Sequence, residues 1–332
     1  MEQPLISVII PTYNYAHFIK YAVESVFHQD YPSEKIEIVI VDDGSQDDTA
    51  TVIAQLQDHR IRYVYQENQG KAAATSHAVE LARGKYIFNL DADDYYLPHK
   101  ISTTVAIFEQ YPNIVHIGNP ALIIKEEEKT EKIEPIPNWM KEKELNGLEL
   151  NRFFLENNML FGGGSTYAAR ANVLKRMPIP KEVDMYIDEY LIFATLLYGN
   201  SYFFAKPLSV WRVHGKNYSG KVRTKEAVAK RHQRLLQSSI GTLHQLKKME
   251  GIPSGLIDLY AFKHQIRVIS HKEKEGKKTW NDILQFWRYY RFENKQSAKV
   301  LKQYSVRNRL IPQSLIKILK KIKYLHDGFT SF

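Results

Sequence analysis

The chain has 332 residues, the length of one large α/β domain with an appendage or of two domains. With 44% hydrophobic and 25% charged residues it has the composition of a globular protein, which excludes disorder. It contains no cysteine, so disulfides, thiolate zinc sites and a cysteine nucleophile are excluded, and any metal ion needs oxygen or imidazole ligands. Because it has no targeting signal and no apolar run of about 18 residues, we expect a cytoplasmic protein.

The net charge of +9 is unevenly distributed along the chain. Residues 215–332 contain 26 of the 46 Lys and Arg but only 8 of the 37 Asp and Glu, which gives them +18 and leaves −9 for residues 1–214. An acidic N-terminal part with a cationic appendage predicts chemistry in the first and attraction to an anionic partner in the second.

Residues 5–120 alternate between short β-branched runs and stretches at helical spacing, which is typical of βαβ units. The expected strands are Leu5–Ile10, Ile36–Val41, Ile61–Tyr65, Lys85–Leu90 and Ile114–Ile117. The expected helices are Ala16–His28, Asp47–Gln57, Gly70–Ala82 and Pro98–Glu109. The predicted fold is α/β, with a mostly parallel central sheet flanked by helices and a basic helical extension at the C-terminus.

The rest of the chain is less regular. Residues 125–144 are rich in Lys and Glu and predict a solvated excursion without catalytic residues. Beyond it we expect a helix over Leu145–Asn157, a strand over Ser165–Ala169, a helix over Met185–Tyr198, and a closing pair of strands over Ser201–Ala205 and Leu208–Val213. After Gly220 the predicted elements are all helices, over Ala227–Lys248, Ser254–Lys272, Thr279–Tyr290 and Pro312–Leu325.

Polar residues follow three of the predicted strands. The first strand leads into Pro11-Thr12-Tyr13-Asn14, the second into Asp42-Asp43-Gly44-Ser45, and the fourth into Asp91-Ala92-Asp93-Asp94. Because ligands of an open parallel sheet bind outside the carboxyl ends of its strands, these residues are expected to meet in one crevice.

Two carboxylates separated by one small residue, as in Asp91-Ala92-Asp93, suit a hard divalent cation that also carries phosphates. The other interpretation is that Asp93 or Asp94 caps a helix. At the second strand end, one carboxylate can accept a hydrogen bond from a ligand N–H such as that of uracil, while Ser45 or Asp47 caps the next helix. Neither glycine-rich phosphate motif is present, which disfavours dinucleotide dehydrogenases and P-loop enzymes and predicts that a nucleotide is held through a metal.

Four motifs resemble, in their order and spacing, those of family 2 glycosyltransferases of the GT-A fold: Val8–Asn14, Val41–Thr49, Asn68–Gly70 and Ala82–Asp94. The resemblance implies inverting transfer of a hexosyl or N-acetylhexosaminyl group from a nucleotide-diphosphate sugar, with UDP favoured by family habit. The implied acceptor is a hydroxyl of a glycan or a lipid-linked molecule in cell-surface polysaccharide biosynthesis.

The resemblance also implies residue roles. Asp43 would face the base, Thr12 and Tyr13 would line the uridine pocket, Asp91 would lie near the ribose and the metal, and Asp93 would be the main ligand of Mn²⁺ or Mg²⁺. The same motifs assign four more residues to the donor site: Pro11, Asn14, Gly70 and Ala92.

Three later segments extend the resemblance. Gly162–Gly164 is similar to the family's glycine loop beneath donor sugar and acceptor, which assigns Gly163 and Gly164 to donor binding; an ordinary turn is the alternative. Ile187–Gly199 resembles the helix that carries the general base and points to Asp188, and because the acidic pair is reversed, Glu189 is the second candidate and Asp184 the third.

Trp211-Arg212-Val213-His214 resembles the family's Arg-x-His ending, which implies that His214 reaches the metal or the diphosphate. Arg212 can instead pair with an acidic neighbour. One departure is that the family's Ala-Arg-Asn after the third motif is replaced by Ala74-Thr75-Ser76-His77, which leaves Lys71 as the available cation near the donor.

We expect a catalytic domain over residues 1–215, with a nucleotide-sugar half (1–120) and an acceptor half (121–215), followed by a basic helical region over 216–332. Aromatic and cationic residues interleave in Trp280–Phe292, and Leu315–Tyr324 alternates Ile and Leu with Lys. This pattern favours a helical bundle that packs its apolar side on the catalytic domain, and the alternative is an interfacial helix that contacts an anionic membrane surface. No nucleic-acid motif is present, so no nucleic-acid partner is expected. The competing function is a non-catalytic adaptor that keeps the sugar-nucleotide fold and whose basic tail binds membrane or an anionic polymer.

Overall fold

The computed structural model describes residues 3–215, 217 and 224–288. The chain divides into two compact units, one comprising residues 1–151 and 160–223 and the other residues 152–159 and 224–332.

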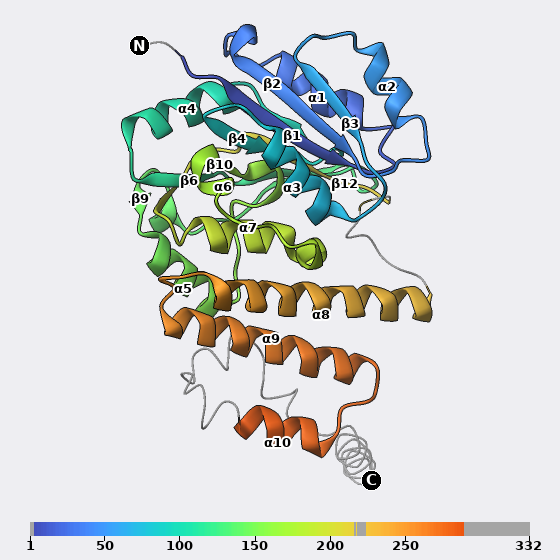
Figure 1. Cartoon of the computed structure of the whole chain (residues 1–332), viewed down its shortest axis with the longest axis vertical. Helices are drawn as coiled ribbons and strands as arrows, with labels where there is room; N and C mark the ends of the chain where they lie inside the picture. Colours follow the sequence, from blue (N-terminus) through green and yellow to red (C-terminus); the bar gives the residue numbers. More distant parts are fainter. Residues whose placement is uncertain (1–2, 216, 218–223, 289–332) are drawn as a thin grey trace, which may run out of the picture. The chain divides into compact units, whose positions relative to one another are not determined.

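The first unit is built on an eight-stranded sheet with the strand order β3-β2-β1-β4-β10-β6-β11-β9 (Figure 1). The strands are β1 (Ile6–Thr12), β2 (Ile36–Asp42), β3 (Ile61–Tyr65), β4 (Tyr86–Asn89), β6 (Ile114–Gly118), β9 (Glu144–Leu145), β10 (Ala168–Arg170) and β11 (Asn200–Phe203). The first four run parallel, and so do β6 and β11, whereas β9 and β10 pair antiparallel with their neighbours. The predicted mostly parallel sheet is therefore confirmed.

Every residue of β1 and β2 is buried, because these apolar, β-branched strands are covered on both faces. The flanking helices are α1 (Ile19–Phe27), α2 (Thr49–Gln55), α3 (Lys71–Leu81), α4 (Lys100–Gln110), α6 (Ala171–Leu174) and α7 (Ile187–Thr195). Helix α5 (Gly147–Asn157) begins in this unit, and its residues from 152 onward belong to the other. Side chains from neighbouring strands and helices form the core, among them Ile6, Ile38, Phe88, Ile101 and Ile117. The elements predicted up to residue 118 are all present, with their ends shifted by at most three residues.

A second sheet, with the order β5-β12-β7-β8, was not predicted. Its strands are β5 (Tyr95–Tyr96), β7 (Ala121–Lys125), β8 (Thr130–Ile133) and β12 (Ser209–Val213). The prediction that Ser201–Ala205 and Leu208–Val213 form a closing pair is wrong: β11 pairs with β6 and β9, and β12 pairs with β7 and β5. The two strands separate because each pairs with strands of a different sheet.

Two further predictions need correction. Residues 125–144 contain β8, the 3₁₀ turn η2 (Asn138–Met140) and β9, although all four residues of β8 are solvent-exposed, as expected for a charged segment. The strand predicted over Ser165–Ala169 begins three residues late, because Gly164–Thr166 forms the 3₁₀ turn η3 before β10. This turn brings the glycine loop and the end of β4 together, as described below.

The second unit contains α8 (Lys225–Lys248), α9 (Ser254–Lys274) and α10 (Trp280–Arg288). The Thr224 hydroxyl accepts a hydrogen bond from the Ala227 N–H and caps α8, and α10 packs on α9 through a ring contact between Phe262 and Phe286 at 5.6 Å. Three of the four predicted helices are present, and the fourth, Pro312–Leu325, lies outside the described residues. Within the described part of the chain, we find no helix whose length and apolarity would let it cross a bilayer.

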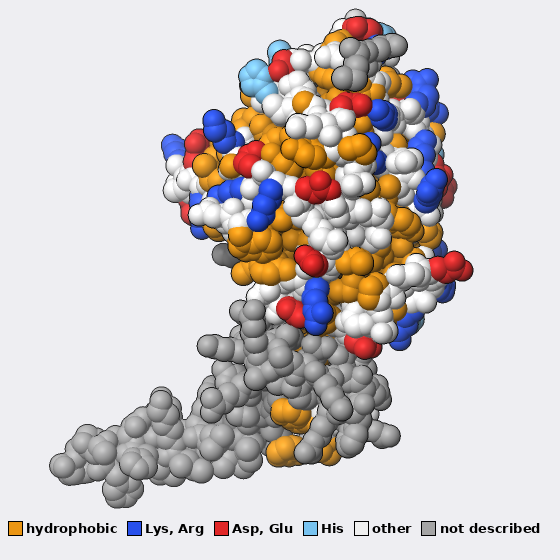
Figure 2. Space-filling model, turned by 90° about the vertical axis from the view of Figure 1, so that its left-hand side faces the viewer, with side chains coloured by type: hydrophobic (Ala, Val, Ile, Leu, Met, Phe, Trp, Pro, Cys, Tyr) orange, Lys and Arg blue, Asp and Glu red, His pale blue; other side chains and the backbone are white. Residues whose placement is uncertain are grey.

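On the face seen in Figure 2, acidic and basic side chains are interspersed among hydrophobic ones. The described residues on this face therefore form no large patch of positive or of negative charge.

Candidate active site

The ends of β1, β2 and β4 lie side by side, and the register places Thr12 opposite Asp42. The turn after β1 is fixed by Asn14, which adopts a φ of 58°. Its backbone N–H donates to Ser45 Oγ at 2.8 Å, and its side-chain oxygen accepts from the Gln46 N–H at 2.8 Å. Asn14 therefore ties together the loops that follow β1 and β2.

The other predicted residues of the first strand end lie in or next to β1. Pro11 is within β1, opposite Val41 of β2. Tyr13 is 40% exposed, whereas Thr12 is buried and its Oγ1 has no hydrogen-bond partner among the described residues. An exposed ring beside an unpartnered hydroxyl is compatible with the predicted base pocket.

Asp43 is buried and determines where α3 begins. Its Oδ1 accepts from Gln66 Nε2 at 2.8 Å and from the Gln69 N–H at 2.9 Å, and its Oδ2 accepts from the Gly70 N–H at 2.7 Å. Gly70 has a φ of 96°, a left-handed conformation that favours glycine. A carboxylate has about four acceptor positions, so one remains for a ligand, and the predicted contact with the base stays a prediction.

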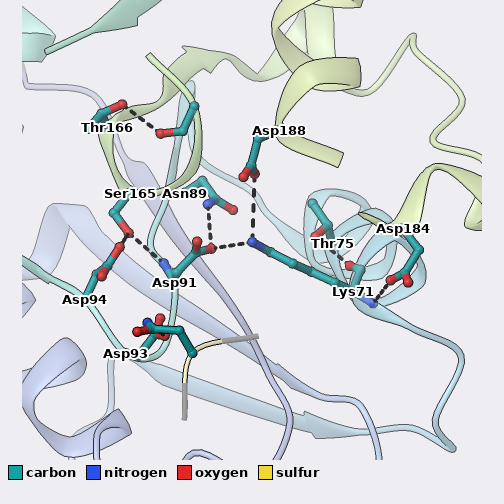
Figure 3. A network of polar contacts seen from close by, with 12 residues as sticks. Lys71, Thr75, Asn89, Asp91, Asp93, Asp94, Ser165, Thr166, Asp184 and Asp188 are labelled. Carbon is teal, nitrogen blue, oxygen red and sulfur yellow. Dashed lines mark hydrogen bonds and ion pairs between the residues drawn. The ribbon is translucent and has the colours of Figure 1, made fainter. Parts of the chain in front are cut away.

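Lys71, the first residue of α3, lies between two carboxylates (Figure 3). Its Nζ is 2.9 Å from Asp91 Oδ1, beyond the end of β4, and 3.8 Å from Asp188 Oδ1 in α7. Burial favours a lower pKa for Lys71, but the charges of Asp188 and Asp91 outweigh it and raise the pKa. Lys71 is therefore a charged link between three elements that are far apart in sequence.

Asp188 lies in the first turn of α7 and faces the glycine loop. Burial raises the pKa of Asp188 and the neighbouring Asp91 adds to the increase, whereas Lys71 and a hydrogen bond from the Gly164 backbone oppose it. A Cβ on Gly163 would lie 3.0 Å from Asp188 Cβ, and one on Gly164 would lie 3.3 Å from Asp91 Oδ2. The loop backbone is thus in direct contact with both carboxylates.

The other two base candidates are placed differently. Asp184 Oδ1 accepts from the Lys71 backbone N–H at 2.7 Å, so this carboxylate holds the start of α3. Glu189 is buried in α7, and because successive helical residues are about 100° apart, its side chain leaves the helix in a different direction from that of Asp188. Asp188, in contrast, faces the Lys71 side chain, with its Oδ1 3.8 Å from Nζ.

Asp93 and His214 come together at the junction of the two sheets. Asp93 is buried, and its Oδ2 is 3.4 Å from His214 Nε2 and accepts from Asn217 Nδ2 at 3.0 Å. The His214 ring is stacked on Phe18 with 4.2 Å between ring centroids. Burial and the charge of Asp91 raise the pKa of Asp93, although Lys71 opposes the change.

The neighbours of these residues are also arranged by local contacts. Ala92 is buried between the two acidic residues of the motif. Asp94 caps no helix; it accepts from Ser165 Oγ at 2.5 Å and from the Arg212 N–H at 3.0 Å. The Arg212 side chain is 2.7 Å from Glu126 Oε1, which is the acidic pairing that the sequence left open. Ser165 Oγ also accepts from the Asp91 N–H at 3.0 Å and so links the glycine loop to the end of β4.

The arrangement therefore contains two adjoining groups. The first is a lysine between two carboxylates beneath a glycine loop, and the second is a buried carboxylate facing an imidazole. Among residues 3–215, 217 and 224–288, no three His, Asp or Glu side chains converge as ligands of one ion. Two protein ligands with further positions filled by phosphate oxygens are nevertheless a usual environment of Mg²⁺.

Sequence reasoning missed several residues around the site: Phe18, Lys100, Asn119, Ser165 and Asn217. Phe18 and Asn217 contact the predicted ligands His214 and Asp93 from segments with no motif of their own. Lys100 is a buried lysine at the start of an amphipathic helix, where the sequence pattern favours an exposed one. No signal in the sequence indicated that these side chains turn inward.

Comparisons with known proteins identify the family of the chain. The model of glycosyl transferase family 2 matches residues 7–179. The chain is 34% identical to an uncharacterized glycosyltransferase of Nostoc sp. (strain PCC 7120) over 217 residues, which cover 64% of this chain and 66% of that protein. The matches span two thirds or less of the length of the curated relatives, 66%, 64% and 48% for three of them.

Two solved structures share the fold. The structure of Staphylococcus aureus TarS residues 1–349 in complex with UDP-GlcNAc is similar with a TM-score of 0.61 at 16% identity, covering 90% of this chain and 89% of that chain. The mannosyltransferase PcManGT from Pyrobaculum calidifontis in complex with GDP-Man and Mn²⁺ is similar with a TM-score of 0.53 at 18% identity, covering 93% and 88%. These likenesses support the GT-A fold. The family model covers more than half of the chain, including all four motifs and the glycine loop, and the chain belongs to glycosyl transferase family 2.

Proposed function

We propose that the protein transfers a hexosyl or N-acetylhexosaminyl group from a nucleoside-diphosphate donor, with inversion, to a hydroxyl of a glycan or lipid-linked acceptor in cell-surface polysaccharide synthesis. The observation that carries the proposal is the position of Lys71 between Asp91 and Asp188, directly under the glycine loop. UDP is the favoured nucleotide, because the TarS structure holds UDP-GlcNAc, although the GDP-Man of PcManGT makes guanosine the alternative.

Asp188 is the proposed general base. It accepts the proton of the acceptor hydroxyl while the hydroxyl oxygen attacks the anomeric carbon, and the bond from that carbon to the nucleoside diphosphate breaks. Burial raises the pKa of Asp188, which favours proton transfer to this carboxylate. Lys71 contributes a positive charge between Asp91 and Asp188. Glu189 is the second candidate for the base.

Asp93 is the proposed main ligand of Mn²⁺ or Mg²⁺, with His214 and Asp91 beside it. The residues fit such an ion, because Asp93 is buried, has an imidazole at 3.4 Å, and lies beside the charge of Asp91. When bound, the metal neutralises the negative charge of the diphosphate. The proposed donor contacts are Pro11, Thr12, Tyr13, Asn14, Asp43, Gly70, Lys71, Asp91, Ala92, Gly163 and Gly164.

The proposal is tested by calorimetric titration with UDP and GDP, with and without Mn²⁺, followed by donor hydrolysis. We expect metal-dependent binding of one nucleotide to the wild type and its loss in Asp93→Ala. The matched control is Asp58→Ala, which removes a carboxylate that pairs with Arg60 away from the described site. Absence of nucleotide binding in the wild type would instead favour the non-catalytic adaptor.

We propose that residues 1–215 are the catalytic domain, with donor binding in residues 1–120 and acceptor binding in 121–215, and that the basic region from 216 onward contacts an anionic membrane surface. The support for the membrane contact is the charge of +18 over residues 215–332 together with an exposed stripe on α10. Trp280, Leu284 and Trp287 are 55%, 63% and 40% exposed and lie at helical spacing, which is the composition of an interfacial helix. The proposed location is the cytoplasmic face of the membrane.

A further inference from the structure

Hydrogen-bonding side chains hold the carbonyls of the glycine loop and of the two residues after it, Ser165 and Thr166. The Gly162 carbonyl lies 3.0 Å from His116 Nε2, and the Gly163 carbonyl accepts from Thr166 Oγ1 at 2.7 Å. The Ser165 carbonyl accepts from Ser209 Oγ at 2.7 Å, and the Thr166 carbonyl accepts from Lys100 Nζ at 3.3 Å. The loop carbonyls are therefore directed into the protein, toward donors from four different elements.

The opposite side of the same loop faces the reacting groups. A Cβ at Gly164 would lie 3.3 Å from Asp91 Oδ2 and 3.8 Å from Asp188 Oδ2, and the Gly164 backbone opposes the rise in the pKa of Asp188. At Gly163 a Cβ would meet Asp188 Cβ at 3.0 Å. Because the loop has no side chains at these positions, its backbone alone determines how it contacts the proposed base.

Of the side chains that hold these carbonyls, Lys100 has an unusual environment. Its side chain is 1% exposed, and its Nζ donates to Asn119 Oδ1 at 2.6 Å as well as to Thr166. The ring of Tyr96 lies 5.3 Å away. Among the described residues it forms no ion pair with a carboxylate, so its charge is stabilised by neutral oxygens and a ring alone. A methionine would fill a similar volume without the cost of burying a charge, so the ammonium is best explained by the oxygens that it holds.

We propose that Lys100 is a positioning residue of the transfer reaction: by holding the Thr166 carbonyl and Asn119 together, it keeps the glycine loop in the position at which Gly164 contacts Asp188. The proposal rests on the assignment of Asp188 as the base. It requires no contact between Lys100 and either substrate. A displacement of the loop by about 1 Å is enough to reduce catalysis by about 100-fold when it moves a reacting group.

The charge of Lys100 responds to pH in a range where activity can be measured. Burial lowers the pKa of Lys100 from 10.5 to about 7. The titratable groups that face it are Tyr96 from β5 and His116 from β6, and burial keeps the His116 ring neutral by lowering its pKa to about 4. Above pH 7 the charge-assisted hydrogen bonds of Lys100 weaken, so its hold on the loop also weakens.

The first experiment measures hydrolysis of UDP-N-acetylglucosamine and of GDP-mannose, as release of nucleotide with Mn²⁺ present, by the full chain. For Lys100→Met we expect kcat to fall by about 10- to 100-fold, while the Kd for UDP or GDP stays within about twofold of the wild type. Lys206→Met, a change at an exposed lysine, is the matched control. An unchanged kcat in Lys100→Met, or an equal loss of kcat and nucleotide affinity, would overturn the proposal.

A second variant tests the charge itself. Asn119→Asp places a carboxylate at the oxygen that already lies 2.6 Å from Lys100 Nζ, which keeps the lysine protonated to higher pH. We expect the wild-type kcat to decline between pH 7 and pH 9, and this decline to disappear in Asn119→Asp. A merely structural role predicts the same pH profile for both proteins.

A third measurement is independent of turnover. Hydrogen exchange of the peptide that covers residues 162–167 is expected to become faster in Lys100→Met and to stay unchanged in the control. An unchanged rate in Lys100→Met contradicts the proposal.

The experiments distinguish a failure of the role proposed for Lys100 from a failure of the proposed function. If Asp188→Asn keeps full hydrolysis, the assigned base is wrong, whereas loss in Asp188→Asn with full activity in Lys100→Met overturns only the role of Lys100.

Discussion

At the scale of single residues, the position of Asp188 leads to the most direct prediction. Replacing it with asparagine removes the proton acceptor but keeps the shape and the contact with the Gly164 backbone. We expect kcat to fall by about 10²–10⁴-fold with nucleotide affinity retained, because a general base acts on the transition state and not on donor binding. Steady-state kinetics and calorimetry with the same protein preparation separate the two quantities.

The matched variant for this prediction is Glu189→Gln, one residue further along α7. It is expected to keep kcat within a few-fold of the wild type, because Glu189 leaves the helix in a different direction from Asp188. A large loss in Glu189→Gln together with full activity in Asp188→Asn would exchange the roles of the two carboxylates.

Lys100 leads to a prediction about stability. Its pKa is lowered from 10.5 to about 7 in the folded protein, so between these values the unfolded chain binds a proton that the folded chain does not. The free energy of unfolding therefore rises with pH across this window, by about 2 kcal/mol from pH 7 to pH 9. Below pH 7 Lys100 is charged in both the folded and the unfolded protein. Burial of this charge then lowers the free energy of unfolding by the whole amount that corresponds to the pKa shift.

The check is urea denaturation of the wild type and Lys100→Met at pH 7, 8 and 9. Groups other than Lys100 titrate equally in both proteins, so the difference between their free energies of unfolding reports Lys100. We expect this difference to shift in favour of the wild type as the pH rises. A difference that stays constant with pH would mean that the pKa of Lys100 is the same in the folded and the unfolded protein.

At the scale of elements, the glycine loop and helix α7 lie so close together that a side chain at Gly163 would contact Asp188. Gly163 has a φ of −99°, so alanine there introduces no backbone strain, and its Cβ would lie 3.0 Å from Asp188 Cβ. We expect Gly163→Ala to lower kcat by about 10- to 100-fold, because the contact displaces the base or the loop. Gly255→Ala in α9, where a Cβ meets nothing within 4 Å, is the control and is expected to keep full activity.

The sequence was sufficient for the strands and helices up to residue 118, because their hydrophobic periodicity agrees with their burial. It was insufficient for the second sheet. β5 is two residues long and β8 is exposed along its whole length, so neither shows a periodic pattern. The partners of β11 and β12 depend on long-range pairing, for which two strands close in sequence give a misleading expectation of a hairpin.

The candidate site shows the same difference between local patterns, which the sequence reveals, and long-range contacts, which it does not. The acidic strand ends and the glycine loop were singled out because their motifs are local, and in the structure Lys71 lies within ion-pair distance of Asp91 and Asp188. The capping role of Asp184 and the inward direction of Lys100 depend on contacts between segments 113 and 66 residues apart, which no local pattern contains.

At the scale of the whole molecule, the charge asymmetry predicts salt-dependent membrane binding. The full chain is expected to sediment with phosphatidylglycerol vesicles at about 0.1 M salt, where the Debye length is about 10 Å, and to be released at about 1 M, where it is about 3 Å. Vesicles of phosphatidylcholine are the control for charge, and Trp280→Ser with Trp287→Ser tests the exposed stripe of α10. Equal binding to both lipids would contradict an electrostatic contact.

One feature of the sheet bears on how the chain folds during synthesis. β10 lies between β4 and β6, and its pairing with β4 joins Ala168 to Phe88 across 80 residues of sequence. When the ribosome has made the first four parallel strands, the free edge of β4 still has unpaired backbone groups. This edge stays open until residues 168–170 emerge, so a nascent chain stalled before that point presents a template for aggregation.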